Sequence, residues 1–355
     1  MTSIELDGIT VGQRDSERLR DVSVEVASGA VLAVLGSSGS GKTTLLRAVA
    51  GLDRVERGTV RFDGRDVTHD EPRDRHVAVV FQHPVLFPKR SVRRNIAFPL
   101  EIDRQPADEI LQRVGAEARA LHIEALLRRR PTTLSSGEAQ AVQIARALVK
   151  QPAVLLLDEP FAHVDAHQTM QFRREVTLIQ RGFGVTTIMA ANESDDAMTM
   201  ADRVAVLEAG RLVQVAAPLD VYETPRTVDA ALLTGAADVF EVTVEGAVEG
   251  SWLAGAGMRI RAWAPALVAH HGRRLQMVVR PEWWQLDPSG RIDAVVVRVE
   301  RLGPHVVLSC LVDGRPMTAK LDRPGAVVAG DRVRLRLDRS VLIDPRDGFR
   351  IDLTP

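Results

Sequence analysis

A glycine-rich run near the N-terminus has the composition and spacing of a phosphate-binding loop. An apolar stretch at 30–35 precedes it and a helical pattern at 45–50 follows it, which is the context such a loop requires. Its glycines allow a tight turn whose backbone N–H groups point at phosphate oxygens, and the helix N-terminus adds a favourable dipole. We expect Lys42 to reach the β and γ phosphates of ATP and the Thr43 hydroxyl to bind Mg²⁺. The loop consists of Gly36, Ser37, Ser38, Gly39, Ser40, Gly41, Lys42, Thr43 and Thr44.

Two adjacent carboxylates, Asp158 and Glu159, follow a second apolar stretch at 153–157. In α/β proteins the carboxyl ends of the strands form the edge where ligands bind. Asp158 is the predicted partner of the Mg²⁺ shell, and Glu159 is the predicted base that orients or deprotonates the attacking water. An Asp-Glu pair after a strand can also simply cap a helix, but the phosphate loop upstream favours the catalytic interpretation.

The pattern of the first 215 residues predicts the elements that position these groups. Short apolar runs alternate with longer helical patterns, which is typical of a mostly parallel α/β sheet. Residues 107–130 are rich in Arg, Glu and Ala and predict a helical subdomain, which we place at about 90–150. The clearest predicted strands are 30–35, 153–157, 186–191 and 204–208.

After residues 218–227 the sequence changes to short strand-like runs separated mostly by Gly and Pro. Several short strands at such spacing predict a small β-barrel or sandwich. We place the domain boundary between 216 and 240 and assign 1–235 to the α/β domain and 236–355 to the β-rich domain. The predicted strands are 240–248, 258–263, 275–279, 291–299, 306–312 and 332–337.

Bulk composition excludes several classes of protein. The 355 residues carry 46 Lys plus Arg against 47 Asp plus Glu, so no general attraction to nucleic acid or anionic lipid is expected. The single cysteine, Cys310, cannot form an internal disulfide and is expected to be a small buried residue. No secretory signal and no apolar run of spanning length is apparent, so we expect a cytoplasmic protein that meets a membrane only through a partner.

Further motifs resemble those of ABC importer ATPases. Val80-Phe81-Gln82 is similar to the Q-loop, and the segment Ser135, Ser136, Gly137, Glu138 is similar to the ABC signature just before the Asp158 strand. The order and spacing of these motifs carry the resemblance over about residues 4–235. The segment 278–282 and the strands after it resemble the OB-like regulatory domain, of TOBE type, of such ATPases.

The resemblance implies an ABC cassette with a helical subdomain and an all-β OB-like domain. Two cassettes would pair head to tail, with ATP between the phosphate loop of one chain and the signature, residues 135–138, of the other. Gln82 would sense the γ-phosphate or help to hold Mg²⁺, and Asp165 would be the D-loop aspartate.

The same resemblance implies the partners and the place of action. Transmembrane permease subunits would be direct partners at the cytoplasmic face of the membrane, together with a second ATP-binding subunit, identical or different. A solute-binding protein would act indirectly, and no nucleic acid is expected. The segments 66–68 and 77–88 most resemble carbohydrate importers.

Four positions depart from the family pattern. Gln13 stands where an aromatic side chain usually stacks on adenine, a contact worth about 1 kcal/mol. Ser136 replaces glycine, which costs roughly 1 kcal/mol if that backbone has positive φ. Glu138 replaces glutamine and adds negative charge. Asn192 replaces the switch histidine, and loss of such a donor costs on the order of 10²- to 10³-fold in rate.

Three functions remain open from the sequence. The first is a competent importer ATPase that tolerates these departures, because Lys42, Gln82, Asp158 and Glu159 are all present. The second is a catalytically slow half that binds ATP while a competent partner chain hydrolyses it. The third is a soluble ABC ATPase without a transport role, which the β-rich tail and the absence of a basic stripe disfavour.

Overall fold

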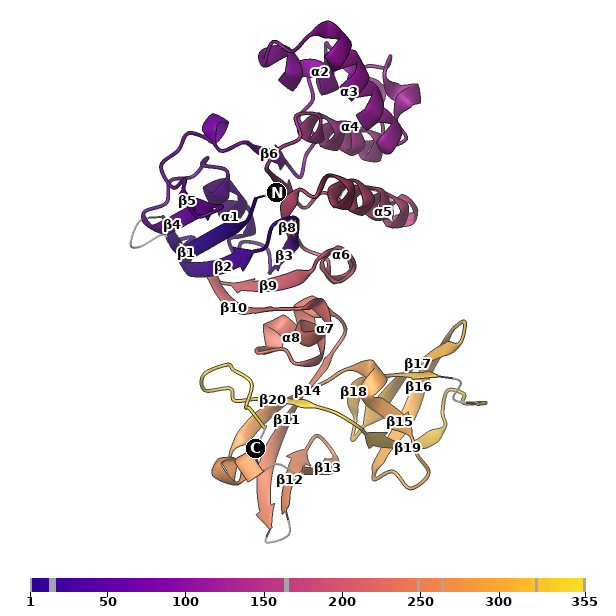
Figure 1. The fold of residues 1–355 in the computed structure, drawn as a ribbon. Coiled ribbons are helices and arrows are strands. Elements are labelled where there is room, and N and C mark those ends of the chain that lie inside the picture. Colours follow the sequence, from indigo (N-terminus) through magenta and orange to yellow (C-terminus); the bar gives the residue numbers. More distant parts are fainter. Residues whose placement is uncertain are drawn as a thin grey trace. The chain divides into compact units, whose positions relative to one another are not determined.

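The chain folds into two compact units, residues 1–219 and 220–355 (Figure 1). The structure is a computed structural model that describes residues 2–12, 17–162, 166–247, 250–262, 265–322 and 325–353. Two predicted site residues, Gln13 and Asp165, lie outside the described residues. The predicted division at 235/236 remains a sequence-based assignment.

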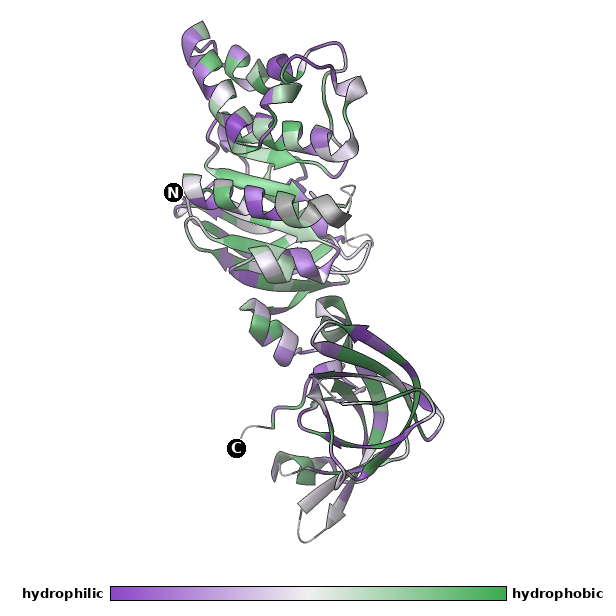
Figure 2. Cartoon of the chain, turned by 90° about the vertical axis from the view of Figure 1, so that its right-hand side faces the viewer, coloured by the Kyte–Doolittle hydropathy of each residue, from purple (hydrophilic) through white to green (hydrophobic). Residues whose placement is uncertain are grey.

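The first unit is built on a six-stranded sheet in the order β10-β9-β3-β8-β7-β6. All pairs except β9 with β10 are parallel, which confirms the predicted parallel sheet. Every residue of β3, β7 and β8 is buried, because helices and a second sheet cover these strands. Figure 2 shows these central strands as predominantly hydrophobic. The bounds are β3 Val31–Leu35, β6 Val77–Val80, β7 Val154–Asp158, β8 Thr186–Ala191, β9 Arg203–Glu208 and β10 Arg211–Ala216.

A second, antiparallel sheet in the first unit was not predicted. Its order is β2-β1-β4-β5, and its inner side chains share one core with helix α1 (Lys42–Val49) and the central sheet. The strands alternate buried and exposed residues, so their apolar signal is half as dense as that of the central strands. The bounds are β1 Ile4–Val11, β2 Leu19–Val26, β4 Arg57–Phe62 and β5 Arg65–Asp66.

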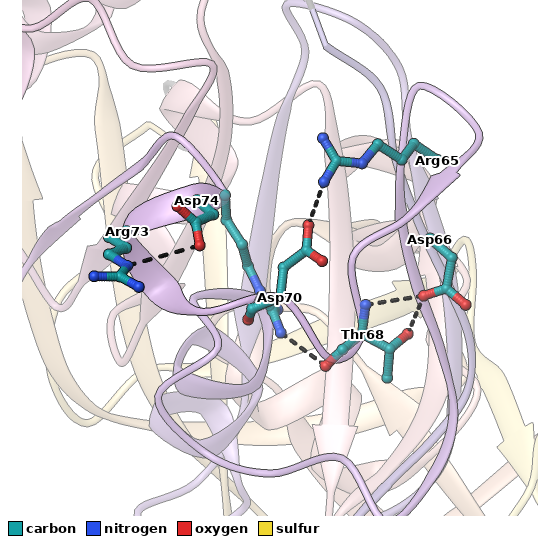
Figure 3. A network of polar contacts seen from close by, with 7 residues as sticks. Arg65, Asp66, Thr68, Asp70, Arg73 and Asp74 are labelled. Carbon is teal, nitrogen blue, oxygen red and sulfur yellow. Dashed lines mark hydrogen bonds and ion pairs between the residues drawn. The ribbon is translucent and has the colours of Figure 1, made fainter.

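The loop after β5 fastens the C-terminal end of α1. Asp66 accepts hydrogen bonds from the backbone N–H and hydroxyl of Thr68, and Arg65 pairs with Asp70 at 2.6 Å (Figure 3). Arg75, almost fully buried, donates to the Thr68 carbonyl and to the last carbonyls of α1, Ala48 O at 3.0 Å and Val49 O at 2.9 Å. A cation satisfying these orphan carbonyls stabilises the helix end.

Three helices form the predicted helical subdomain, which lies beyond β6 in Figure 1. They are α2 (Val92–Ile102), α3 (Ala107–Ala120) and α4 (Ser136–Leu148), and they pack on one another. Helices α5 (Ala166–Phe183) and α6 (Ser194–Met200) follow β7 and β8 along the chain. Among the described residues, no helix combines the length and apolar character needed to span a bilayer.

The second unit begins within α7 (Pro218–Glu223), includes α8 (Val228–Thr234) and continues as two five-stranded antiparallel sheets. Their orders are β13-β12-β11-β14-β20 and β15-β19-β16-β17-β18, and one apolar core joins them, which confirms the predicted β-rich domain. Cys310 lies in this core, as expected. The bounds are β11 Asp238–Ala247, β12 Gly250–Gly255, β13 Met258–Ala262, β14 Arg274–Val279, β15 Trp284–Leu286, β16 Ile292–Leu302, β17 His305–Val312, β18 Arg315–Asp322, β19 Arg332–Leu337 and β20 Val341–Ile343.

Arg280 anchors α7 and α8 to this β-rich unit. Its guanidinium is fully buried, stacks over the Tyr222 ring at 4.0 Å and donates to the carbonyl oxygens of Tyr222 and Ala231. It also donates to the carbonyl of Gly235 and to the Thr234 hydroxyl. A buried guanidinium is tolerated only when its donors are used in this way.

Candidate active site

The phosphate loop connects β3 directly to α1, as predicted. Gly39 and Gly41 have φ of 79° and 111°, in the region that favours glycine. A Cβ on Gly41 would lie 2.7 Å from the Arg18 carbonyl oxygen, and one on Gly36 would lie 2.5 Å from the Leu207 carbonyl oxygen. Close backbone approach therefore requires glycine at both positions, and at Gly41 the backbone conformation requires it as well.

Lys42 lies buried at the start of α1. Its Nζ donates to the carbonyl oxygens of Gly36 at 2.7 Å and Ser37 at 3.2 Å, so the ammonium group sits inside the loop. Burial lowers the pKa of Lys42, and the carboxylates of Glu159 and Asp158 oppose that shift. A partly desolvated cation in a ring of backbone groups fits a phosphate oxygen as its counter-charge.

A second feature of the loop also fits a phosphate group. The hydroxyl of Ser40 is buried and has no hydrogen-bond partner within the described residues. A buried hydroxyl without a partner costs free energy unless a ligand or solvent pairs with it. The loop therefore offers both a buried cation and an unused hydroxyl on a helix N-terminus.

Thr43 and Asp158 come together although 115 residues separate them. The Thr43 hydroxyl donates to Asp158 Oδ1 at 3.1 Å, because α1 starts beside the carboxyl end of β7. Burial raises the pKa of Asp158, and the hydrogen bond from Thr43 opposes that shift. A hydroxyl and a carboxylate are the oxygen ligands that Mg²⁺ takes beside substrate phosphates, so this pair fits the predicted magnesium position.

Glu159 and Gln82 also meet, from the ends of neighbouring strands β7 and β6. The Gln82 Nε2 donates to Glu159 Oε2 at 2.9 Å. Glu159 has a φ of 47°, an uncommon conformation for this residue type, and its N–H donates to the Ala190 carbonyl at 3.1 Å. Backbone strain of this kind occurs at functional sites, and here it falls on the residue predicted to be the catalytic base.

Asn192 is exposed and follows β8 directly. Strand β8 pairs with β3 on one side and β7 on the other, and Ala191 is opposite Leu35, the last residue before the phosphate loop. Asn192 therefore lies at the sheet edge between the strand leading to Lys42 and the strand leading to Glu159.

The signature segment caps helix α4 in the helical subdomain. The Ser135 hydroxyl accepts from the Glu138 N–H and the Glu138 carboxylate accepts from the Ser135 N–H, which is a reciprocal capping box. Glu138 also pairs with Arg129 at 3.0 Å, so its negative charge is partly balanced.

Ser136 is the first residue of α4 and has no positive φ. The strain that a serine would have at positive φ therefore does not arise, because a right-handed helical backbone accepts a side chain at this position. Gly137, likewise within the helix, has no positive φ either.

The motifs did not predict the side chains that shape the Q-loop, residues 81–91. Asn95 of α2 is fully buried; its Oδ1 accepts from the Phe87 N–H at 2.8 Å and its Nδ2 donates to the Ser91 carbonyl at 3.0 Å. Gln143 of α4 contacts the same loop through both ends of its amide. Asn95 belongs to a segment, 95–98, that resembles the Q-loop region of ABC importer ATPases, whereas the signal for Gln143 was only a polar residue in a predicted helix.

A strand, glycine loop and helix whose lysine and threonine face an acidic pair at the end of another parallel strand of the same sheet define a P-loop nucleotide-binding ATPase. Comparison with known proteins narrows this class. A protein-family model described as "ABC transporter" matches residues 19–162, and one described as "TOBE domain" matches residues 277–343.

Two proteins named "sn-glycerol-3-phosphate import ATP-binding protein UgpC" are similar over their full length. The one from Paracoccus denitrificans is 36% identical over 99% of this chain and 100% of its own. The one from Ruegeria pomeroyi is 36% identical over 99% of both chains. This chain therefore belongs to the family of ATP-binding subunits of ABC transporters, an ATPase family, and it binds nucleotide.

Solved structures agree with this assignment. The structure of cbiO1 from Clostridium perfringens, described as part of the ABC transporter complex cbiONQ, has a TM-score of 0.58 and 29% identity. The match covers 62% of this chain and 90% of the cbiO1 chain. A dimeric ATP-binding cassette in a post-hydrolysis state has a TM-score of 0.55 and 24% identity over 60% of this chain and 98% of its own, which supports the fold alone.

Proposed function

We propose that this chain is the ATP-hydrolysing subunit of an ABC importer and couples ATP-driven dimer closure to solute uptake. The observation that carries the proposal is the convergence of Lys42, Thr43, Asp158, Glu159 and Gln82 at one edge of the central sheet, through contacts of 2.9 and 3.1 Å. These residues come from three separate segments, so the local loop sequence alone does not explain their convergence.

The phosphate loop, residues 36–44, would bind the phosphates of ATP, with Lys42 as the cation for the β and γ groups. Thr43, Asp158 and Gln82 would hold Mg²⁺, which supplies charge neutralisation on the phosphates when bound. Because Lys42 already donates to the carbonyls of Gly36 and Ser37, phosphate oxygens would compete with these carbonyls for its protons.

Glu159 would orient the attacking water and accept its proton. In the structure its Oε2 accepts from Gln82, so Gln82 competes with water for one acceptor position on this oxygen. The Gln82 contact therefore favours a resting arrangement, and release of Gln82 would accompany the approach of nucleotide and metal.

The remaining assignments concern the assembly. The signature, residues 135–138, would complete the site of a second ATP-binding subunit, with Asp165 at the same interface. The cassette, residues 1–235, would act beneath transmembrane permease subunits at the cytoplasmic face of the membrane, served indirectly by a solute-binding protein. Residues 236–355 would form the regulatory domain. The names of the relatives support a carbohydrate-derived solute such as sn-glycerol-3-phosphate.

A second candidate function is that of a slow half which binds ATP beside a faster partner. Asn192 supports it, because its short neutral amide occupies the sheet-edge position between β3 and β7. Asparagine still donates a hydrogen bond but carries no positive charge. The capping role of Glu138 and the helical backbone of Ser136 give no support to this candidate.

The test of the primary proposal is Glu159→Gln in the full chain. The substitution keeps the size of the side chain and removes its basicity, so we expect ATP to bind and remain trapped while turnover stops. Phosphate release and bound ATP after gel filtration measure both effects. Glu193→Gln is the matched control, because Glu193 is an exposed carboxylate near the same sheet edge; its turnover should equal that of wild type. Equal hydrolysis by wild type and Glu159→Gln would exclude the proposed base.

A further inference from the structure

The side chain of Gln143 binds the Q-loop at two points. It projects from the signature helix α4 and is 1% exposed. Its Nε2 donates to the Phe81 carbonyl oxygen at 2.9 Å, and its Oε1 accepts from the Val85 N–H at 2.7 Å. Because both backbone groups would lose their partner if this amide left, the contact fixes the loop segment firmly.

Gln82 lies between these two contacts in the sequence. Its own amide donates to Glu159 at 2.9 Å, so α4 is linked to the proposed catalytic base through the Gln143 hydrogen bonds, the backbone around Gln82 and the Gln82 hydrogen bond. A displacement of α4 would therefore act on the Gln82–Glu159 contact directly.

The rest of the Q-loop is held independently. Asn95 of α2 binds Phe87 and Ser91, and the Phe87 ring packs edge-on against Phe98 of the same helix at 4.6 Å. Loss of the Gln143 amide would thus remove two hydrogen bonds from residues 81–85 and leave the contacts of residues 87–91 in place.

We propose that Gln143 is a positioning residue for ATP hydrolysis, which ties Gln82 to the helix that carries the signature segment. Gln143 holds the backbone on both sides of Gln82, so its amide sets the position from which the Gln82 side chain meets Glu159. This role rests on the proposed function, because it needs Glu159 to act in hydrolysis. Gln143 itself contacts the backbone of the Q-loop and acts through Gln82.

The same helix offers a matched control for the test. Gln140 is 3% exposed, and neither end of its amide has a hydrogen-bond partner within the described residues. Gln143→Leu and Gln140→Leu therefore make the same chemical change at the same depth, and only the first removes hydrogen bonds to the Q-loop. We expect Gln143→Leu to lower kcat roughly tenfold, as when one or two buried hydrogen bonds are lost from the transition state. The KM for ATP should change by less than about twofold, and Gln140→Leu should keep both constants within about twofold of wild type.

A double-mutant cycle separates positioning from general damage. In a Gln82→Ala background the side chain that Gln143 positions is missing, so Gln143→Leu should lower kcat by less than about twofold further. An equal loss in both backgrounds, or an equal loss in Gln140→Leu, would overturn the role. If Gln143→Leu does not fold, Gln143→Glu keeps the acceptor for Val85 and removes the donor to Phe81, and it should give the same pattern.

The outcomes also separate this role from the proposed function. A wild-type chain that binds no nucleotide and hydrolyses none, alone or with its membrane partners, would refute both. A wild-type chain that hydrolyses ATP while Gln143→Leu matches it would refute the positioning role and leave the proposed function standing.

Discussion

Replacing Asn192 with histidine tests whether this position limits hydrolysis. Asn192 follows Ala191 in the chain, and Ala191 pairs with Leu35, the residue immediately before the phosphate loop. On the β7 side of β8, the Glu159 N–H donates to the Ala190 carbonyl oxygen. Residue 192 thus lies at the sheet edge between the phosphate loop and the base, and an imidazole at this position is longer than the amide of asparagine.

The expected gain in rate depends on the hydrogen-bond donor that the Asn192 amide already provides. A missing donor to developing charge costs on the order of 10²- to 10³-fold in rate. Asn192 retains a donor, so the histidine should restore only part of this, roughly tenfold in kcat, which corresponds to about 1.4 kcal/mol of barrier. Binding of ATP in the ground state should change little, because Lys42 and the loop amides supply most of the phosphate contacts.

The assay is steady-state phosphate release at saturating ATP and Mg²⁺, with kcat and KM fitted separately. Asn192→Gln is the control, since it lengthens the amide without adding an imidazole. A gain in Asn192→His alone points to the ring, and an equal gain in both variants points to reach. No rise in kcat in either variant would refute the reasoning and remove the main support for a slow half.

Two further predictions concern buried charge in each unit. Burial raises the pKa of Glu117 to about 7, so its neutral form stabilises the fold below the unfolded value near 4.5, and this stability is lost as pH rises from there towards 7. Glu117→Gln should remove this pH dependence, which amounts to up to about 3 kcal/mol of unfolding free energy. Urea unfolding of wild type and variant at pH 5 and pH 8 measures it, because the difference in unfolding free energy between the two proteins should change between these pH values. An equal difference at both pH values would contradict the prediction. Arg280→Met leaves the carbonyls of Tyr222, Ala231 and Gly235 without their donor and should destabilise the β-rich unit by about 3 to 5 kcal/mol, with nucleotide binding retained. A calorimetric trace identical to that of wild type would contradict this prediction.

The local sequence was sufficient for the phosphate loop and the central strands. Glycines at 36, 39 and 41 specify the turn through close approach and positive φ, and five-residue apolar runs specify strands buried on both faces. The sequence pattern alone predicts both features, although the backbone atoms that approach Gly41 and Gly36 belong to the distant residues Arg18 and Leu207. The capping box of Ser135 and Glu138 was equally local, and it could have shown that Ser136 begins a helix.

The alternating strands β1, β2 and β4 escaped prediction because half of their residues face away from the core. Their pairing depends on residues up to about sixty positions apart, as in Ile4 opposite Phe62. Register between such segments follows from packing against α1, which no single window of sequence contains.

The site itself shows the same division. Residue types identified Lys42, Asp158 and Glu159 as the chemical groups, because their roles depend on side-chain chemistry and on position at the end of a strand. Only the folded chain placed Thr43 against Asp158 and Gln82 against Glu159, and only it brought Gln143 to the Q-loop. These contacts join segments 58 to 115 residues apart, so the packing of α1 and α4 around the sheet determines them and local preference does not.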